Sequence, residues 1–471
     1  MATKQELSQL EDLASVTSSD KILGYNPTAN KFGFVPLDFV TNNGYACRRW
    51  NEASSTPVGE ACGNIEYLRN LPSLLGLGCY LVDKNHGRRK LDPANHYKFA
   101  TGETAKLDGS MGDYMWGWGT SFYYATWTEG QYYYEAASLK PIPGRLNYRI
   151  PVASMSALGV AVVDRENDEL VSVINEAGRY RGGNNDATLD TAFNTQLGRA
   201  ATNETCEAYS IKARKKGDYW EANWYGHRAI TAALMRIIMG TRNLQSAYNA
   251  NKDANGLYQG GLGSGVTNVG TWWSNSWDYY PFLPTSVGVE LGDKCGVSSY
   301  TVKNSAGTAL QTVSVPVFFG LKNFFGYIGR WGRGRLIEKI AGGGFNMWVT
   351  TKLSQTYSMT STAGLVKAAT GPANSSAGWS FIKKMSMNYL CHTPTVVGGT
   401  ESTYYADACY NDNAASGLRV PYEGGHADYS GTAGPEYLAV SNAVTTAVAH
   451  VGVPLCEAEE DWSTEPFLVP A

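Results

Sequence analysis

Residues 420–456 read VPYEGGHADYSGTAGPEYLAVSNAVTTAVAHVGVPLC, and they combine a regular frame with an unusual composition. Glycine recurs among small and apolar residues in this stretch, at Gly424-Gly425, Ala433-Gly434 and Val451-Gly452. From Gly424 to Cys456 there is no Lys, Arg, Gln, Met or Trp, although the whole chain has 13 Trp and 39 Lys plus Arg. This pattern indicates a fixed backbone frame that carries short, chemically varied side chains.

These varied side chains are the first candidate ligand-binding residues: His426, Asp428, Tyr429, Thr432, Ser441, Asn442, Thr445 and His450. Tyr, Ser, Asn and Asp are common in binding loops, because they provide contact area and hydrogen bonds at modest entropic cost. Tyr404, Tyr405, Tyr410 and Asn411 are predicted to extend the same surface. A strand through 436–444 would alternate its side chains between two faces, but Asn442 among apolar neighbours predicts an irregular backbone.

A metal or catalytic role for this stretch would need more than one pair of residues. His426 and Asp428 would share a face of a strand, but the sequence singles out no third partner for them. DRENDE (164–169) has carboxylates that could hold calcium, yet it does not match the fixed ligand positions of an EF-hand, so a solvated turn is preferred. We therefore predict no metal, no cofactor and no catalytic residue.

Length and composition restrict the possible classes of protein. At 471 residues the chain forms either two to four domains or one heavily decorated domain. The net charge of −3 argues against a nucleic-acid partner, and no apolar run is long enough for membrane insertion. The polar beginning shows no signal peptide, so synthesis in the cytoplasm with free thiols is expected, and the eight scattered cysteines include no CxxC pair.

Three regions follow from the composition. Residues 1–44 are predicted to be an attachment or oligomerisation module, with a helix over 1–21 and a hairpin over 21–40 that turns at Asn26–Asn30. Residues 45–315 would be a decorated region, with strands in 110–136 and around 296–319, and two helices that end at Gly217 and Gly240. Residues 316–471 would form the core domain, with the variable region at about 424–456 and a further strand near 344–358.

Enzyme motifs are scarce. The GxGxxG, GxxxxGK[ST], HExxH and GxSxG patterns are absent in usable context. GRWGRGR (329–335) lacks the Lys-Ser/Thr of a phosphate loop, and we interpret its three arginines as a solvated turn. TWWSNSWDYY (271–280) is a different case, because Trp273 and Trp277 either stack on a ligand such as a sugar ring or plug a long insertion as a core cluster.

Two segments resemble C-type lectin-like folds of the formylglycine-generating-enzyme type. PVFFGLKNFFGYIGRWGRG (316–334) is similar to the family's G-[IL]-x-N-x-x-G-[NHY]-[VI]-x-x-W segment at Gly320, Leu321, Asn323, Phe325, Gly326, Ile328 and Trp331. The end of the chain resembles the family's GG-x-W…AG-x-F-x-L…x-G-x-R-L at Gly424, Gly425, Ala433, Gly434, Tyr437, Leu438, Gly452 and Leu455. It departs at Ala427, where Trp is frequent, and at Pro454, where Arg is frequent. The resemblance implies an α+β, C-type lectin-like fold with large insertions behind the N-terminal module.

The ending further resembles the variable region of proteins that are diversified by retroelements, as in phage tail-fibre tips. There, randomised adenines of AAC codons yield NNC codons, which cannot encode Lys, Gln, Met, Trp or Glu. That rule accounts for most of the missing residue types and predicts that Glu436 is a fixed position. A tight Gly/Ala-rich fold that excludes long side chains is the alternative explanation.

The resemblance extends to other segments and implies a function. Residues 10–37 are similar to modules at the N-termini of phage tail and fibre proteins, and 107–124 to a DGS-x-GD-x-M segment of tail-fibre proteins. It implies a non-enzymatic receptor-binding protein of a virion, a homotrimer that contacts other tail proteins through its N-terminus and a host-surface glycan or protein through its tip. The alternatives are a structural virion component, or an enzyme such as a formylglycine-generating-type oxidase or a tail-tip hydrolase.

Overall fold

The computed structural model describes residues 21–26, 31–36, 44–183, 186–193, 195–263, 283–304, 306–374 and 378–470. Strands make up 37% of the structure and helices 12%, in several mostly antiparallel sheets. The predicted α+β, C-type lectin-like fold is therefore wrong. Helical periodicity is confined to a few segments of this chain, whereas its many short aromatic and β-branched runs satisfy their backbone by pairing across long sequence distances.

A six-stranded sheet is formed mainly by the N-terminal half. Its order is β30 (Phe467–Leu468), β11 (Leu146–Ile150), β9 (Phe122–Glu129), β10 (Tyr132–Ser138), β3 (Ala46–Asn51) and β4 (Glu60–Gly63). Trp127 and Tyr134 are direct cross-strand partners, and their rings stack at 4.9 Å between centroids. Such aromatic pairs stabilise a sheet, which explains why the aromatic run 110–136 forms strands, as predicted.

A seven-stranded sheet joins both halves of the chain. Its order is β15 (Trp220–Ala222), β29 (Leu455–Ala458), β12 (Ala153–Ser156), β8 (Asp113–Trp118), β5 (Gly78–Val82), β6 (Arg88–Asp92) and β7 (Asn95–Phe99). Every residue of β29 is buried, and this strand lies between β15 and β12. The C-terminal end of residues 424–456, the stretch predicted to be variable and called the variable stretch below, is thus held inside a sheet of the N-terminal half.

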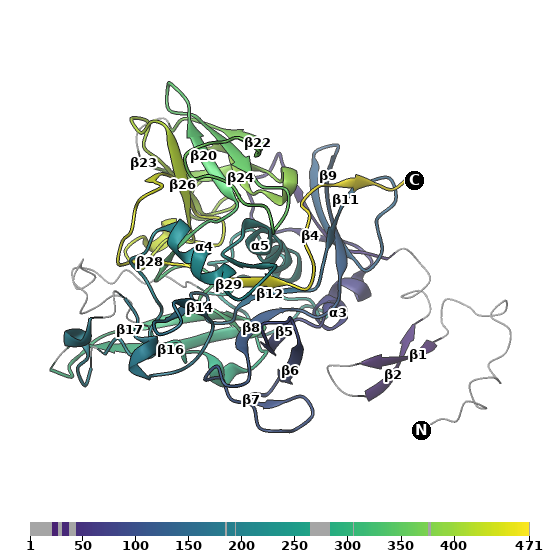
Figure 1. The fold of residues 1–471 in the computed structure, drawn as a ribbon. Helices are drawn as coiled ribbons and strands as arrows, with labels where there is room; N and C mark the ends of the chain where they lie inside the picture. The colour runs from purple at the N-terminus through teal and green to yellow at the C-terminus, as the bar shows by residue number, and fades with distance from the viewer. Residues whose placement is uncertain are drawn as a thin grey trace.

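The helices begin or end at capping residues in several places. They are α3 (Ile65–Leu75), α4 (Cys206–Arg214) and α5 (Tyr225–Met239). The Thr205 hydroxyl accepts from the backbone N–H of Ala208 at the start of α4, and Gly240 ends α5 in the left-handed conformation, as predicted. All residues of α5 are buried, and it packs against β3, β10 and β12 (Figure 1).

The largest sheet has ten strands and carries the variable stretch. Its main path is β22 (Val366–Gly371), β21 (Phe345–Val349), β20 (Arg335–Lys339), β26 (Leu418–Glu423), β27 (Leu438–Ala443), β25 (Ala408–Asn411), β23 (Gly378–Ser386) and β24 (Thr393–Val397). The short strands β19 (Gly329–Trp331) and β28 (Val451–Gly452) are parallel partners, and β19 also pairs with β26. In Figure 1 this sheet lies above α5 and the seven-stranded sheet lies below it.

The remaining elements are short. The smaller sheets contain β1 (Lys21–Asn26) and β2 (Lys31–Pro36); β13 (Val162–Asp164) and β14 (Glu169–Val171); and β16 (Gly296–Lys303), β17 (Ala309–Phe318) and β18 (Leu321–Lys322). Single 3₁₀ turns are η2 (Gly178–Tyr180), η3 (Ala187–Leu189), η5 (Val289–Leu291), η6 (Asn388–Leu390) and η7 (Ser430–Thr432). The β1–β2 pairing confirms the predicted N-terminal hairpin; the predicted helix over 1–21 and the turn residues 27–30 lie almost wholly outside the described residues.

Sheet pairing crosses the expected boundary between residues 45–315 and 316–471. β12 and β15 pair with β29, and β11 pairs with β30. The two regions therefore share their hydrogen-bonded framework.

Within the described residues, no helix is both long enough and apolar enough to cross a lipid bilayer.

Candidate functional site

The variable stretch contributes strands to the interior of the ten-stranded sheet, where β27 lies between β26 and β25. β26 leads into it at Gly424, and β27 and β28 return through it before β29 enters the seven-stranded sheet. β23, β26 and β28 lie on the same side of the molecule in Figure 1. The β26–β27 register shifts between Val420 and Tyr422, which confirms the predicted irregular backbone in this part of the chain.

Three of the predicted site residues form a cluster of rings. The His426 ring centroid lies 3.8 Å from that of Tyr429 and 4.5 Å from that of His450. Tyr422 of β26 makes edge contacts with all three rings, at 6.2–6.4 Å. These contacts fix the two histidines and the tyrosine relative to the sheet.

Trp379 extends the ring cluster to the surface. This β23 residue stands directly opposite Tyr410 of β25, with ring centroids 4.8 Å apart, and it also contacts the Tyr429 ring at 5.4 Å. Its indole N–H donates to the Tyr437 hydroxyl over 3.3 Å, yet the residue is 48% exposed. We call Trp379, Tyr410, Tyr429, His426 and His450 the ring surface.

Sequence reasoning did not single out Trp379. The alternation in GWSFIKK (378–384) is a signal for a half-buried strand that presents this side chain on one face. The pairing with Tyr410, 31 positions along the chain, is a tertiary contact that no local pattern reveals.

The other predicted residues of the stretch differ in exposure. Asp428 and Thr445 are exposed, and Thr432, Ser441 and Asn442 are half-buried. The Ser441 hydroxyl accepts from the backbone N–H of Asp412 (2.8 Å), and the Thr432 hydroxyl donates to the Tyr429 carbonyl (2.7 Å). Asp428 and Thr445 are therefore the most accessible polar side chains of the predicted set.

The remaining predicted residues do not join the ring surface in the described contacts. Tyr405 is buried under the Arg242 guanidinium, and half-buried Tyr404 receives the Lys383 ammonium group over its ring, 5.1 Å from the centroid. Trp273 and Trp277 lie outside the described residues.

Buried charges hold the start of the variable stretch. The Glu423 carboxylate, at the end of β26, pairs with Arg228 of α5 (3.2 Å) and with Arg335 of β20. It also accepts from the side-chain amide of Asn223 (2.8 Å). Arg228 in turn donates to the Pro435 carbonyl (2.5 Å), so α5 is tied to both ends of the 424–435 loop.

Glu436 anchors the next turn. Its carboxylate pairs with Arg236 of α5 and with Nδ1 of His392 (2.9 Å), and its backbone N–H donates to Asp407 (2.7 Å). Burial acts to raise the pKa of Glu436, but His392 and Arg236 outweigh it and lower the value to about 2. A buried, doubly paired carboxylate fits the prediction that Glu436 is a fixed position.

The three arginines of 329–335 are buried, so their interpretation as a solvated turn was wrong. Arg330 is fully buried and donates to the carbonyls of Gly159 (3.1 Å) and Ile328 (2.5 Å). Arg333 pairs with Glu207 (2.6 Å), and Arg335 with Glu423. Apart from Ile328, these partners come from distant segments, which the glycine-rich local sequence could not indicate.

The two histidines of the ring surface are held in their neutral form. Burial is the main cause that lowers the pKa of His426 well below its ordinary value, and proximity to His450 lowers it further. Burial also lowers the pKa of His450 to about 4. The backbone N–H of Asp428 donates to Nδ1 of His426 (3.2 Å), which places the imidazole proton on Nε2. At neutral pH the surface therefore presents uncharged aromatic rings.

One cluster elsewhere has the side-chain types that bind metal ions. Cys79, His96 and Asp293 place a thiol, an imidazole and a carboxylate within 4.8 Å of one another. Asp293 already pairs with His96 (2.9 Å) and with the Lys90 ammonium group (3.1 Å). These contacts satisfy its charge without an ion, and the cluster lies on β5, β7 and the segment after η5, away from the strands of the ring surface.

The DRENDE segment connects β13 and β14. Its Asp164 pairs with Arg179, and its Asp168 pairs with Lys212 (2.6 Å) and Lys215 (2.7 Å). Asp164 is buried, whereas residues 166–168 are exposed, so only the middle of the segment agrees with the preferred interpretation as a solvated turn.

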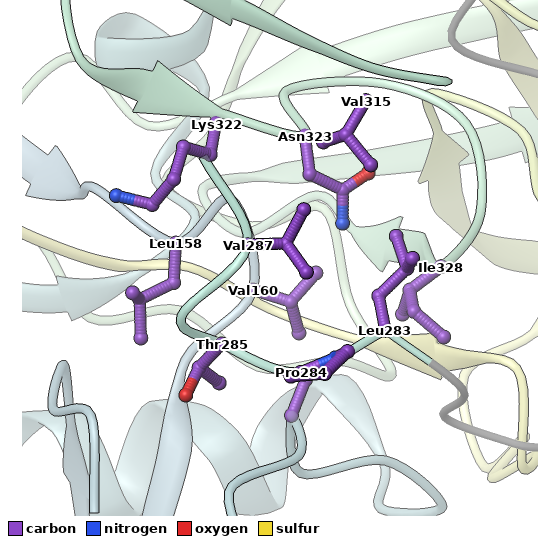
Figure 2. Close-up of a pocket in the computed structure, with 11 residues that line it drawn as sticks. Leu158, Val160, Leu283, Pro284, Thr285, Val287, Val315, Lys322, Asn323 and Ile328 are labelled. Atoms are coloured by element: carbon purple, nitrogen blue, oxygen red, sulfur yellow. The ribbon is translucent and has the colours of Figure 1, made fainter. Parts of the chain in front are cut away.

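A small hollow lies between β17, β18 and the segment after residue 282. Figure 2 shows that aliphatic side chains such as Val160, Leu283 and Ile328 form most of its lining. The Lys322 ammonium group points away from this lining and donates to the Tyr114 hydroxyl over 2.9 Å. Thr285 and Asn323 are the uncharged polar side chains of its lining, and most of the other lining residues are aliphatic.

The chain was compared with models of known protein families and with curated proteins, and neither comparison found a match.

Proposed function

We propose that this protein is the receptor-binding component of a phage tail fibre, and that its ring surface contacts a ligand on the host cell. It acts by binding, not by catalysis. Trimers assembled through residues 1–44 would present three such surfaces at one tip, so that each can bind weakly while the assembly binds strongly. The resemblance of the 424–456 composition to retroelement-diversified proteins supports this proposal.

The observation that carries the proposal is the contact between Trp379 and Tyr429. It joins an exposed aromatic ring on β23 to the stretch whose composition suggests variation. Exposed tryptophan and tyrosine rings act as anchors in binding sites, and they stack on sugar rings as well as on protein surfaces. The exposed Asp428 and Thr445 add polar groups from the same stretch.

The frame beneath the surface supports the same function. Glu423 and Glu436 are held by arginines of α5, a helix that is buried along its whole length. Side chains such as Asp428 and Thr445 can change without disturbing these ion pairs, because they take no part in them. A rigid scaffold with exchangeable surface groups is what a variable recognition protein requires.

The test is competition for adsorption to host bacteria. Purified native protein is expected to bind the cells and to block adsorption of the phage that carries it. Trp379→Ala should weaken binding by about 2 kcal/mol per site, roughly thirtyfold. Tyr97→Ala is the matched control, because Tyr97 is 51% exposed on β7, in a different sheet.

Both variants must first show the same oligomeric size and melting temperature as the native protein. Periodate treatment of the cells should abolish binding if the receptor is a glycan, and protease treatment if it is a protein. If native protein neither binds cells nor blocks adsorption, the proposal fails and a structural role in the virion takes its place. Equal binding by Trp379→Ala would place the receptor site elsewhere.

A further inference from the structure

Two of the eight cysteines face each other across neighbouring strands. Cys47 of β3 and Cys62 of β4 are direct partners in the antiparallel register. They pack in one small cluster with Tyr45 and Trp127, and the pKa of each thiol depends on the other. The remaining cysteines on strands stand opposite other residue types: Cys79 opposite Trp116, Cys409 opposite Ser380 and Leu438, and Cys456 opposite Met155 and Glu221.

The strand register places the Cα atoms of the two cysteines at a distance that a disulfide can span. Directly opposed residues of an antiparallel pair have Cα atoms about 4.5 to 5.5 Å apart. Disulfides join Cα atoms that are about 4.4 to 6.8 Å apart. Bond formation between Cys47 and Cys62 therefore requires no change in strand pairing.

The two thiols differ in access and in environment. Cys47 is buried, whereas Cys62 is half-buried and can meet a reagent from solvent. The neighbouring Cys47 thiol lowers the pKa of Cys62, and the nearby Arg49 and Arg48 guanidiniums lower it further against the opposing effect of burial. Cys62 is thus the more accessible and the more readily deprotonated thiol, and Cys47 is placed beside it as the resolving thiol.

We propose that Cys47 and Cys62 form an intrachain disulfide when the protein meets an oxidised thiol pool such as oxidised glutathione. The Cys62 thiolate attacks one sulfur of the glutathione disulfide and releases one glutathione thiolate. Cys47 then loses its proton to that thiolate and attacks Cys62 in the mixed disulfide, which releases the second glutathione. Two protein thiols are oxidised, one external disulfide is reduced to two thiols, and no other reactant is needed.

The cross-link has a defined structural effect. β4 is the edge strand of the six-stranded sheet and is held by β3 alone within it. The disulfide closes the loop between residues 47 and 62, which reduces the conformational freedom of the unfolded chain and prevents the edge strand from separating. The inference does not rest on the proposed function.

Tryptic mapping tests the cross-link directly, because cleavage after Arg48 and Arg49 separates the two cysteines. The full-length protein is incubated with oxidised glutathione, its free thiols are alkylated, and it is digested without reductant. A linked pair of peptides containing Cys47 and Cys62 is expected, with two fewer alkylated thiols than in the reduced protein. The melting temperature should rise on oxidation and return after dithiothreitol treatment.

Cys62→Ser should lose both the linked peptides and the rise in melting temperature. Cys409→Ser, which removes a buried cysteine on β25, should keep both. If the oxidised native protein has no Cys47–Cys62 peptide, or if it links a different pair, the inference is overturned. The peptide map reports on the covalent bond itself, so a change in stability of a variant cannot imitate it.

Discussion

At the scale of single residues, the ring surface depends on histidines that stay uncharged. His426 and His450 lie among the rings of Tyr422 and Tyr429. A positive charge on either imidazole would be poorly solvated there and would repel the other. The neutral rings can pack closely, and the surface keeps its shape only while they remain neutral.

This arrangement predicts a loss of stability in mild acid. The unfolded chain protonates its histidines near pH 6.5, whereas folded His450 does so near pH 4. Between these values the unfolded state binds more protons than the folded state. The contribution of His450 to the free energy of unfolding is therefore constant above about pH 6.5 and decreases as the pH falls towards about 4. Urea unfolding across this range should show His450 contributing roughly 2 kcal/mol to the decrease.

His450→Phe is the informative variant, because it keeps a ring against His426 and removes the titrating group. Its free energy of unfolding should change less over the same pH range than that of the native protein. An unchanged pH dependence in this variant would show that the acid sensitivity arises from other groups.

At the scale of elements, the turn after β26 requires glycine for two separable reasons. Gly425 has a φ of +70°, and a Cβ there would lie 2.6 Å from the Cβ of Ala433. Gly417, before the same strand, has a φ of +73° but open space around it. The two positions therefore share the backbone conformation and differ only in crowding.

Comparison of Gly425→Ala with Gly417→Ala should separate these contributions. Gly417→Ala is expected to lower the free energy of unfolding by about 1 kcal/mol, from left-handed backbone strain alone. Gly425→Ala should cost roughly 1–3 kcal/mol more, because the 425–433 turn must open to admit the methyl group. Equal losses in denaturant unfolding would contradict the close approach at Gly425.

Local sequence patterns predicted several of the helices and strands. The hairpin strands in 21–40, the strands in 110–136 and the helix that ends at Gly240 were correctly anticipated, whereas the helix predicted to end at Gly217 already ends at Arg214. Their signals are carried by neighbours in sequence: turn residues, capping residues and apolar periodicity. α3 was not anticipated, although Asn64 and Gly76 cap it at either end.

At the scale of the whole molecule, the C-terminal segment closes the fold. β29 is fully buried between β15 and β12, so it completes a sheet built from residues far earlier in the chain. β30 adds only to the edge of the six-stranded sheet, with Phe467 and Leu468 exposed. The two strands should therefore differ sharply in their importance for folding.

Two truncations test this difference. Removal of residues 467–471 deletes β30 alone. The shortened chain should remain soluble and unfold cooperatively, with a melting temperature close to the native value. Removal of 455–471 also deletes β29 and exposes the edges of β15 and β12, so the chain should be recovered mainly as aggregate. Cooperative unfolding of the shorter chain would show that the two halves fold independently. Soluble yield and circular dichroism on heating distinguish these outcomes.

The sequence by itself determined the N-terminal hairpin, the strands in 110–136, the helix end at Gly240 and the unusual composition of 424–456. Only the tertiary structure decided the mostly β architecture, the burial of Arg330, Arg333 and Arg335, and the meeting of Trp379 with Tyr410 and Tyr429. The physical reason is the range of the interactions involved. Caps, turns and periodicity act over a few residues, whereas strand pairing and buried ion pairs join positions that become neighbours only when the whole chain folds.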